Sequence, residues 1–237
     1  MRLLDLTLES PASNLALDEA LLTAAEEDKA GEVLRLWESP QLAVVLGRSS
    51  SIAAEVNQEA CHVDEVPLLR RSSGGASVVI GPGCLLYSVV LSYVERPYLQ
   101  LLEQAHQFVL QKLVTALRPF VPEVAIQGTS DLTVGGHKFS GNSLRCRRNH
   151  LLYHGTVLYD FDLPSVTRYL AEPPRQPTYR CRRSHGAFIT NVPITSRDLR
   201  RGLATVWGAQ ASRDWPRQRA EELLATKFSR NEWTRSR

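Results

Sequence analysis

The most apolar stretch of the 237-residue sequence, SVVIGPGCLLYSVVLSYV at residues 77–94, is interrupted near its middle by Gly-Pro-Gly. Each half has the length of a strand, whereas a helix that crosses a membrane needs about 20 consecutive apolar residues. Glycine and proline together favour a turn over a continuous helix. We therefore predict two buried strands on either side of residues 81–83, and we expect no membrane span.

Runs of apolar residues bounded by turn residues predict the other strands, at residues 1–8, 33–38, 42–47, 66–71, 123–128, 131–134, 137–143 and 151–161. Helical spacing of apolar residues predicts helices at residues 11–27, 52–64, 98–120, 162–170, 196–208 and 216–228. Strands and helices are grouped rather than alternating one by one. This grouping predicts an α+β fold in which mixed or antiparallel sheets are flanked by helices, and we expect residues 1–237 to form a single domain.

The charge balance does not favour nucleic acid as a partner. The formal net charge is +3, whereas nucleic-acid-binding domains usually carry a strongly basic face. Arginines nevertheless cluster at Arg70-Arg71 and in two RCRR segments, 145–148 and 180–183. Such clusters bind carboxylates or phosphates in many proteins, and a solvated basic surface is the alternative interpretation.

Cysteine spacing bears on the cellular compartment. The four cysteines, at positions 61, 84, 146 and 181, follow no CxxC pattern of a zinc or redox site. The opening MRLLDLTLES lacks the layout of a signal peptide. We expect free thiols in a reducing, cytoplasmic setting.

A glycine-rich segment, RRSSGGAS at residues 70–77, directly follows a predicted strand. Gly74 and Gly75 permit unusual dihedral angles and a close backbone approach to a ligand, and successive N–H groups in such a turn can bind an anion. Side chains of consecutive strand residues point to opposite faces, so at most one of Arg70 and Arg71 can share that ligand. A plain hairpin turn is the alternative.

The segment DLTVGGHKFSGNS, Asp131–Ser143, has the pattern of a β-hairpin closed by Gly-Gly. The period-2 alternation places Lys138 on the sheet face opposite Phe139. We expect a bulge or turn at Ser140–Ser143. On base rates alone Lys138 would be an exposed lysine on a sheet face.

The strand at residues 151–161 places His154 on the same face as Leu152 and Thr156. Gly155 beside it allows another chain segment to approach closely. A lone strand histidine is more often structural than catalytic. Likewise, the local sequence selects none of Cys84, Cys146 and Cys181 as a nucleophile, although arginines flank Cys146 and Cys181 and would lower the pKa of an exposed thiol.

Several segments in order give the chain a family resemblance. They are NLALDEALL (14–22), LRLWESPQLAVVLGRSS (34–50), EVN (55–57), PLLRRSSGGASVV (67–79), GTSDLTVGGHKFSGNSLRCRRNHLLYHGTVLYDFDL (128–163) and TKFSRNEW (226–233). Together they resemble lipoate–protein ligase A, a family that shares its fold with octanoyltransferases and biotin–protein ligases. The long middle block carries the most specific match.

The resemblance implies roles for individual residues. The RRxSGG match implies that a lipoyl and phosphate-binding loop is formed by Arg70, Arg71, Ser73, Gly74, Gly75 and Ala76. The DLTVxGxK match makes Lys138 the lysine that contacts the acyl carbonyl and the α-phosphate. It also places Ser130 and Asp131 near the nucleotide, with Asp131 near a metal. The LxHGTxL match places His154, Gly155 and Thr156 in the acyl pocket.

The activity that the resemblance implies has two steps. Lipoate or octanoate reacts with ATP, with Mg²⁺ present, to give an acyl-adenylate, and the acyl group then passes to a lysine of an acceptor protein. The implied acceptors are the lipoyl domains of 2-oxoacid dehydrogenase E2 proteins and the glycine-cleavage H protein. A fixed ammonium and backbone N–H groups would stabilise the charge that builds on phosphate oxygens.

Two departures from the family pattern keep alternatives open. Ile80 and Gly81 stand where the ligases usually have a His-Asp pair, and Ala76 replaces a third glycine. The chain ends soon after TKFSRNEW, so we expect no C-terminal accessory domain and count a separate accessory-domain protein among the candidate partners. The alternatives are an octanoyltransferase that takes octanoate from acyl carrier protein through a thioester on Cys84 or Cys181, and a non-catalytic acyl-binding subunit.

Overall fold

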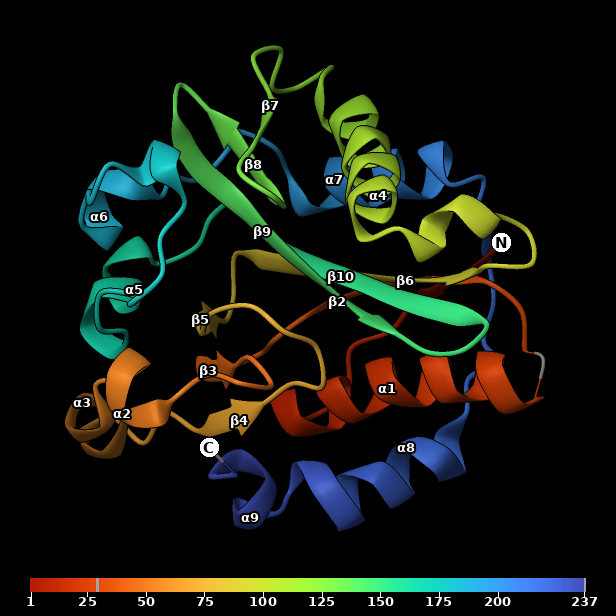
Figure 1. The fold of residues 1–237 in the computed structure, drawn as a ribbon, viewed down its shortest axis with the longest axis horizontal. Helices are drawn as coiled ribbons and strands as arrows, with labels where there is room; N and C mark the ends of the chain where they lie inside the picture. The colour runs from red at the N-terminus through yellow and green to blue at the C-terminus, as the bar shows by residue number, and fades with distance from the viewer. Residues whose placement is uncertain (29, 237) are drawn as a thin grey trace.

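The computed structural model describes residues 1–28 and 30–236, and most of its strands form one twisted sheet with helices on both faces (Figure 1). The strand order of this large sheet is β11-β1-β2-β6-β10-β9-β8-β7. A smaller sheet has the order β4-β3-β5. The strands are β1 (Arg2–Asp5), β2 (Val33–Glu38), β3 (Ala43–Leu46), β4 (Leu68–Arg70), β5 (Val78–Ile80), β6 (Cys84–Ser92), β7 (Ala125–Gln127), β8 (Asp131–Val134), β9 (His137–Cys146), β10 (His150–Leu158) and β11 (Gln210–Ala211).

Both sheets are mixed, which confirms the predicted α+β class. In the large sheet β1 pairs in parallel with β2 and β11, and the other pairings are antiparallel. In the small sheet β3 pairs in parallel with β4 and antiparallel with β5. Among the described residues, no helix combines the length and the apolar character needed to cross a bilayer.

The helices cover the large sheet from two sides, with α4 and α7 on one face and α1 and α8 on the other (Figure 1). The helices are α1 (Pro11–Asp28), α2 (Ile52–Glu55), α3 (Gln58–Val63), α4 (Leu102–Leu117), α5 (Leu163–Tyr169), α6 (His185–Phe188), α7 (Ser196–Val206), α8 (Arg217–Leu223) and α9 (Asn231–Thr234). Short 3₁₀ turns lie at Pro97–Gln100 and Thr178–Arg180, and α8 continues as a π turn over Leu224–Phe228.

Strand β6 explains the apolar stretch from which the fold was predicted. Every residue of this strand is buried, because its two faces pack into different cores. Tyr87 and Val89 belong to the core under α4, whereas Val90 belongs to the core under α1. The Gly-Pro-Gly turn carries the chain from β5 in the small sheet to β6 in the large one. Gly83 has a φ of 81°, and a Cβ there would lie 2.0 Å from the Asp160 carbonyl oxygen, so the turn requires glycine.

The hairpin of β8 and β9 has the predicted two-residue turn. Gly135 and Gly136 have φ values of 54° and 76°, the conformation for which Gly-Gly is favoured in tight hairpins. The bulge or turn predicted at Ser140–Ser143 was wrong in position. The register passes from Leu132–Ser140 to Thr133–Lys138, so the bulge falls one residue earlier. Strand β9 then continues to Cys146, because β10 pairs with its second half.

The helices differ from the prediction in four places, one of which is α6, where no helix was predicted. The helix predicted at 52–64 is split into α2 and α3, because Val56 forms a β-bridge with Leu170 and Asn57 caps α3. The helix predicted at 98–120 begins only at Leu102, after a 3₁₀ turn. The last predicted helix is followed by the additional helix α9.

Candidate active site

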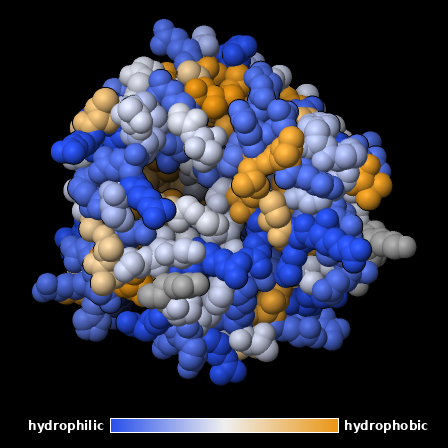
Figure 2. All heavy atoms as spheres, in the orientation of Figure 1, coloured by the Kyte–Doolittle hydropathy of each residue, from blue (hydrophilic) through white to orange (hydrophobic). Residues whose placement is uncertain are grey.

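Two chambers meet in the space between the small sheet and the β8–β10 part of the large sheet. We name the first, of about 240 Å³, the sheet chamber, and the second, of about 160 Å³, the loop chamber. They share seven lining residues, which are Ala76, Ser77, Val78, Asp131, Lys138, Gly141 and Thr156. Figure 2 shows a hollow with apolar residues inside it, at the place where Figure 1 has β9 beside α5 and α6.

The sheet chamber exposes mainly apolar surface, and its polar side chains come from several elements. Its apolar lining consists of Leu15, Trp37, Val45, Val78, Ile80 and Leu86. Its polar lining includes Asp18, Arg71, Tyr87, Ser130, Asn142, Ser143 and His154. A cavity of this composition suits a mostly apolar ligand with one polar end. Ile80 is part of this apolar wall, and Gly81 packs so closely on Leu42 that a Cβ would lie 2.7 Å from Leu42 Cδ2.

Arg71 fixes the glycine-rich loop, residues 70–77, from within. Its side chain donates to the carbonyl oxygens of Val45, Gly74 and Ala76 and to the Ser73 hydroxyl. Burial lowers the pKa of Arg71 to about 10, against the opposing effect of Glu55, so the guanidinium stays charged at neutral pH.

The glycines of this loop allow two segments to touch. Gly75 has a φ of 86°, a conformation that glycine adopts without strain. A Cβ on Gly47 would lie 1.8 Å from the Gly75 carbonyl oxygen. The turn at 47–50 and the glycine-rich loop can therefore approach this closely only because position 47 is also glycine.

Arg70 lies on the other side of β4 and lines neither chamber. Only 1% of it is exposed. Its guanidinium donates to the carbonyl oxygens of Gly47, Arg48 and Ser50 and to that of Thr234 in α9. The structure thus brings Arg71, Ala76 and Gly75 to the sheet chamber and directs Arg70 away from it, as the strand alternation requires.

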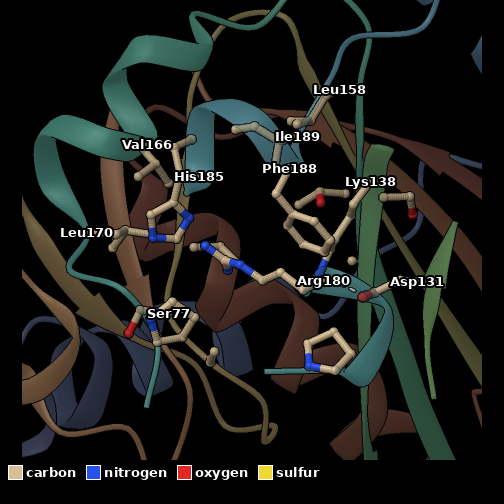
Figure 3. A pocket seen from close by; sticks show the side chains of 18 of the residues that line it. Ser77, Asp131, Lys138, Leu158, Val166, Leu170, Arg180, His185, Phe188 and Ile189 are labelled. Carbon is tan, nitrogen blue, oxygen red and sulfur yellow. Dashed lines mark ion pairs between the residues drawn. The ribbon is translucent and has the colours of Figure 1, made fainter. Parts of the chain in front are cut away.

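Lys138 stands at the junction of the two chambers. Its Nζ lies 2.7 Å from Asp131 Oδ1, the ion pair drawn as a dashed line in Figure 3. The other oxygen, Asp131 Oδ2, accepts a hydrogen bond of 2.7 Å from the Tyr179 hydroxyl. A Cβ on Gly141 would lie 2.8 Å from Lys138 Nζ, so the lysine rests directly on the backbone of that glycine. Phe139, the next residue, is fully buried in the opposite core, as predicted.

His154 in β10 and Ser73 in the glycine-rich loop join the large sheet to that loop. The His154 Nε2 and the Ser73 hydroxyl share a hydrogen bond of 2.5 Å, and His154 Nδ1 lies 3.5 Å from Asp18 Oδ2. Asp18 also accepts hydrogen bonds from Arg35 and from the Ser88 hydroxyl. Burial raises the pKa of Asp18, but Arg35, His154 and Ser88 together hold it below its ordinary value.

The sequence prediction missed Asp18 and Arg35. In the sequence, both residues could have been recognised as charged residues among apolar ones. Asp18 lies one helical turn from Leu15 and Leu22 in α1, and Arg35 lies between two buried leucines in β2. The two residues are buried and 2.6 Å apart at their nearest atoms. Buried charges of opposite sign are expected to pair.

Asn142 and Gly155 close the wall between β9 and β10. The Asn142 side chain accepts from the Tyr87 hydroxyl and donates to the Ser130 carbonyl oxygen. A Cβ on Gly155 would lie 1.8 Å from Asn142 Oδ1. Thr156, the next residue, lines both chambers.

Asp131 does not form a preformed Mg²⁺ site in this arrangement. Both of its carboxylate oxygens are engaged, one by Lys138 and one by Tyr179. Within the described residues, no group of three or more histidine, cysteine, aspartate or glutamate side chains is placed to hold a metal ion. The donor set expected for a protein-bound hard cation is therefore lacking here.

Residues that the sequence prediction did not select line the loop chamber. They come from the Pro-rich segment 171–184 and from α5 and α6, and they include Arg175, Arg180, His185, Phe188 and Ile189. Figure 3 labels the last four of these. Arg180 is buried, pairs with Glu172 and lies with its Cζ 4.7 Å from the centre of the Phe188 ring. A chamber with arginines and an aromatic side chain suits a ligand that has both anionic and aromatic parts.

No cysteine among the described residues lines either chamber. Cys84 is fully buried, and burial raises the pKa of its thiol far above the ordinary value. Cys181 is exposed, but it lines a separate hollow on the outer side of segment 171–184. Cys61 is buried and Cys146 is exposed.

Comparisons with known proteins agree with this geometry. Residues 10–199 match the sequence model of the family described as the lipoyl protein ligase A/B catalytic domain. The probable lipoate-protein ligase A of Mycoplasma genitalium is 31% identical over 161 residues, 68% of this chain and 46% of that protein. The putative lipoate-protein ligase A of Aeropyrum pernix is 32% identical over 164 residues, 69% of this chain and 59% of that protein. The chain thus spans about half the length of these curated relatives.

Solved structures show the same fold. A bi-partite lipoate protein ligase from Thermoplasma acidophilum superposes with a TM-score of 0.84 at 21% identity, over 99% of this chain and 95% of that one. A lipoate-protein ligase A bound with ATP superposes with a TM-score of 0.79 at 21% identity, over 99% and 98% of the two chains. The family match over residues 10–199, which covers most of the chain, shows that the chain belongs to the lipoyl protein ligase A/B catalytic domain family.

Proposed function

We propose that this protein is a lipoate–protein ligase, which activates lipoate or octanoate with ATP and transfers the acyl group to a lysine of a lipoyl-domain protein. The observation that carries the proposal is the meeting of two chambers at Lys138. Relatives named lipoate-protein ligase A, and similar folds described with lipoic acid or with ATP bound, support the choice of substrates.

Each chamber has the chemistry of one substrate. The apolar sheet chamber suits the acyl chain of lipoate, and the loop chamber, with Arg180 and Phe188, suits the nucleotide. The carboxylate of the acid and the α-phosphate of ATP would then come together beside Lys138. Charge accumulates there on phosphate oxygens, and a fixed ammonium stabilises that charge.

The reaction balances without a protein nucleophile. A carboxylate oxygen bonds to the α-phosphorus while the bond to pyrophosphate breaks, which leaves an acyl-adenylate. The neutral amine of the acceptor lysine then bonds to the acyl carbon, AMP leaves with the bonding electrons, and the amine loses a proton to solvent. Lys138 can donate to the acyl carbonyl oxygen and to an α-phosphate oxygen in both steps, since the carbonyl and phosphate oxygens of an acyl-adenylate are neighbours.

In this proposal Mg²⁺ binds together with ATP, through the nucleotide phosphates. Mg²⁺ is commonly held through substrate phosphates and waters, with few protein ligands. This agrees with the engagement of both Asp131 oxygens by protein groups.

We also propose the setting of this activity. Residues 1–237 would act as one catalytic domain in the cytoplasm, in line with the free thiols. A separate accessory-domain protein would assist formation of the adenylate, as the bi-partite description of the Thermoplasma acidophilum ligase suggests. The acceptors would be lipoyl domains of E2 proteins and the glycine-cleavage H protein. That same structural study pairs its ligase with an E2 lipoyl domain.

One assay separates this function from its alternatives. Purified protein is incubated with apo lipoyl domain and either lipoate with ATP and Mg²⁺ or octanoyl acyl carrier protein, with and without accessory-domain protein, and the acceptor mass is measured. We expect a lipoyl adduct in the first mixture. Modification from octanoyl carrier protein alone would refute the ligase, and no adduct in any mixture would favour an acyl-binding subunit.

A further inference from the structure

The short helix α9 reaches the glycine-rich loop through one arginine. The Trp233 indole Nε1–H donates to the Arg70 carbonyl oxygen at 2.8 Å, and the Arg70 Nε–H donates to the Thr234 carbonyl oxygen at 2.9 Å. Thr234 is 6% exposed and Arg70 is 1% exposed. Two hydrogen bonds, one buried and one partly buried, therefore tie α9 to β4, more than 160 residues earlier in the sequence.

Arg70 also hydrogen-bonds to the turn at residues 47–50. Its Nη1 donates to the carbonyl oxygens of Gly47, Arg48 and Ser50 at 2.7, 3.2 and 2.9 Å. A guanidinium with fixed geometry that binds three carbonyl oxygens of one turn holds that turn in a single conformation. The conformation of the turn is thus set by a side chain that α9 itself orients.

The turn at 47–50 in turn holds the glycine-rich loop. The Arg48 amide donates to the Ser73 carbonyl oxygen at 2.8 Å, and the Ser50 hydroxyl donates to the Gly75 carbonyl oxygen at 3.2 Å. Gly75 lines the sheet chamber, and Ser73 hydrogen-bonds to His154 in its wall. The contact series therefore runs from α9 to the chamber without any step longer than a hydrogen bond.

We propose that Trp233 and Arg70 are positioning residues for the acyl-binding loop, acting through the 47–50 turn and not by touching substrate. This assigns Arg70 a role different from the direct ligand contact that the family resemblance implies. It also gives α9 a part in substrate binding. The inference rests on the proposed function only for its kinetic test, because the position of the loop can be measured without catalysis.

The variant Trp233→Phe tests the proposal, since it keeps the aromatic ring and removes the indole donor. The ring also lies 4.1 Å from Lys227 Nζ, a contact that phenylalanine preserves. We expect amide hydrogen exchange across residues 72–77 to accelerate about fivefold, the effect of losing one ordinary hydrogen bond. The matched control is Trp215→Phe, a change in a ring that packs on the core under α1 and against Arg217; it should leave exchange at 72–77 unchanged.

A double-mutant cycle gives the second readout. We expect Trp233→Phe and Arg70→Lys each to raise KM for lipoate more than they lower kcat. The increase in KM of the double variant should be smaller than the product of the two single increases, because both residues act through one contact series. In the double variant of Arg70→Lys and Trp215→Phe, the two effects on KM should multiply. If Arg70→Lys fails to fold, the exchange measurement on Trp233→Phe decides alone.

Two outcomes would overturn the proposal. One is unchanged exchange at residues 72–77 in Trp233→Phe, and the other is a multiplicative effect of Trp233→Phe with Arg70→Lys. A protein that shows no transfer activity would contradict the proposed function. The exchange result would still decide whether α9 positions the loop.

Discussion

Replacing Lys138 by methionine removes the cation at the junction of the two chambers and keeps most of the length of the side chain. The Lys138–Asp131 pair is partly exposed, with 28% and 12% of the two side chains accessible. Ion pairs of this exposure contribute about 0.2–1 kcal/mol to the free energy of unfolding. Asp131 also keeps its hydrogen bond from Tyr179. We therefore expect Tm to change by less than about 4 °C in a chain of this length.

The effect on catalysis should be much larger. Removing one preorganised donor from a developing oxyanion typically costs a factor of about 10²–10³ in kcat, or about 2.7–4 kcal/mol. Lys138 lines both chambers, so we expect both adenylate formation and acyl transfer to slow by about this factor. The Tm and kcat changes together separate a catalytic cation from a structural one.

The assay follows the mass of apo lipoyl domain after mixing with enzyme, lipoate, ATP and Mg²⁺, and it follows pyrophosphate release in the absence of acceptor. The matched control is Lys112→Met on α4, where the ammonium donates to the Val206 carbonyl oxygen on the outer surface. The control should keep its activity. Transfer by Lys138→Met within about threefold of the unmodified protein would refute the role of Lys138.

Three further predictions concern Gly155, Asp18 and the two candidate cysteines. Gly155→Ala should lower the free energy of unfolding by about 1–3 kcal/mol, because its Cβ would lie 1.8 Å from Asn142 Oδ1. Thermal denaturation checks this, with Gly186→Ala as the control, since a Cβ at Gly186 meets only Thr167 Oγ1 at 3.9 Å. Equal Tm values for the two variants would contradict the prediction. Asp18→Ala should lower Tm by about 6–20 °C, since breaking a buried ion pair costs about 3–5 kcal/mol. The pKa of Asp18 is lowered in the folded protein, so the ionised carboxylate contributes to the free energy of unfolding above its unfolded pKa of about 4, and this contribution is lost as pH falls through the pKa of the folded protein. A difference in stability between the unmodified protein and Asp18→Ala that grows on acidification would refute this direction. Cys84→Ala and Cys181→Ala should each keep lipoate transfer, since neither thiol lines a chamber, and loss of transfer in a folded Cys181→Ala protein would instead support a thioester.

The sequence predicted the elements whose signal is local. Alternation with a Gly-Gly turn predicted the β8–β9 hairpin and the opposite orientations of Lys138 and Phe139, which the structure confirms. The bulge at Phe139 and the continuation of β9 depend on pairing with β8 and β10. The bulge is set by the register between β8 and β9, and the continuation by the hairpin of β9 with β10, and the residue pattern of segment 131–143 contains neither.

The site was predictable where a residue type has a strong positional meaning. Arg71 and the glycines follow from the RRxSGG pattern, and strand alternation separates Arg70 from Arg71. The contact between Tyr179 and Asp131 joins residues 48 positions apart, and it arises only when segment 171–184 folds over the hairpin. Similarly, Cys84 looks like any other cysteine in the sequence, and only its complete burial in β6 removes it as a nucleophile.

The shared wall of the two chambers has a thermodynamic consequence. A ligand in either chamber that draws Lys138 away from Asp131 prepares that ammonium for a ligand in the other chamber. We therefore expect two such ligands to bind with positive cooperativity, because the cost of separating the ion pair is met only once. Linkage requires reciprocity: nucleotide must tighten the binding of the acid by the same factor by which the acid tightens the binding of nucleotide. The size of this shared factor, measured by calorimetry, would be set by one lysine placed between two cavities.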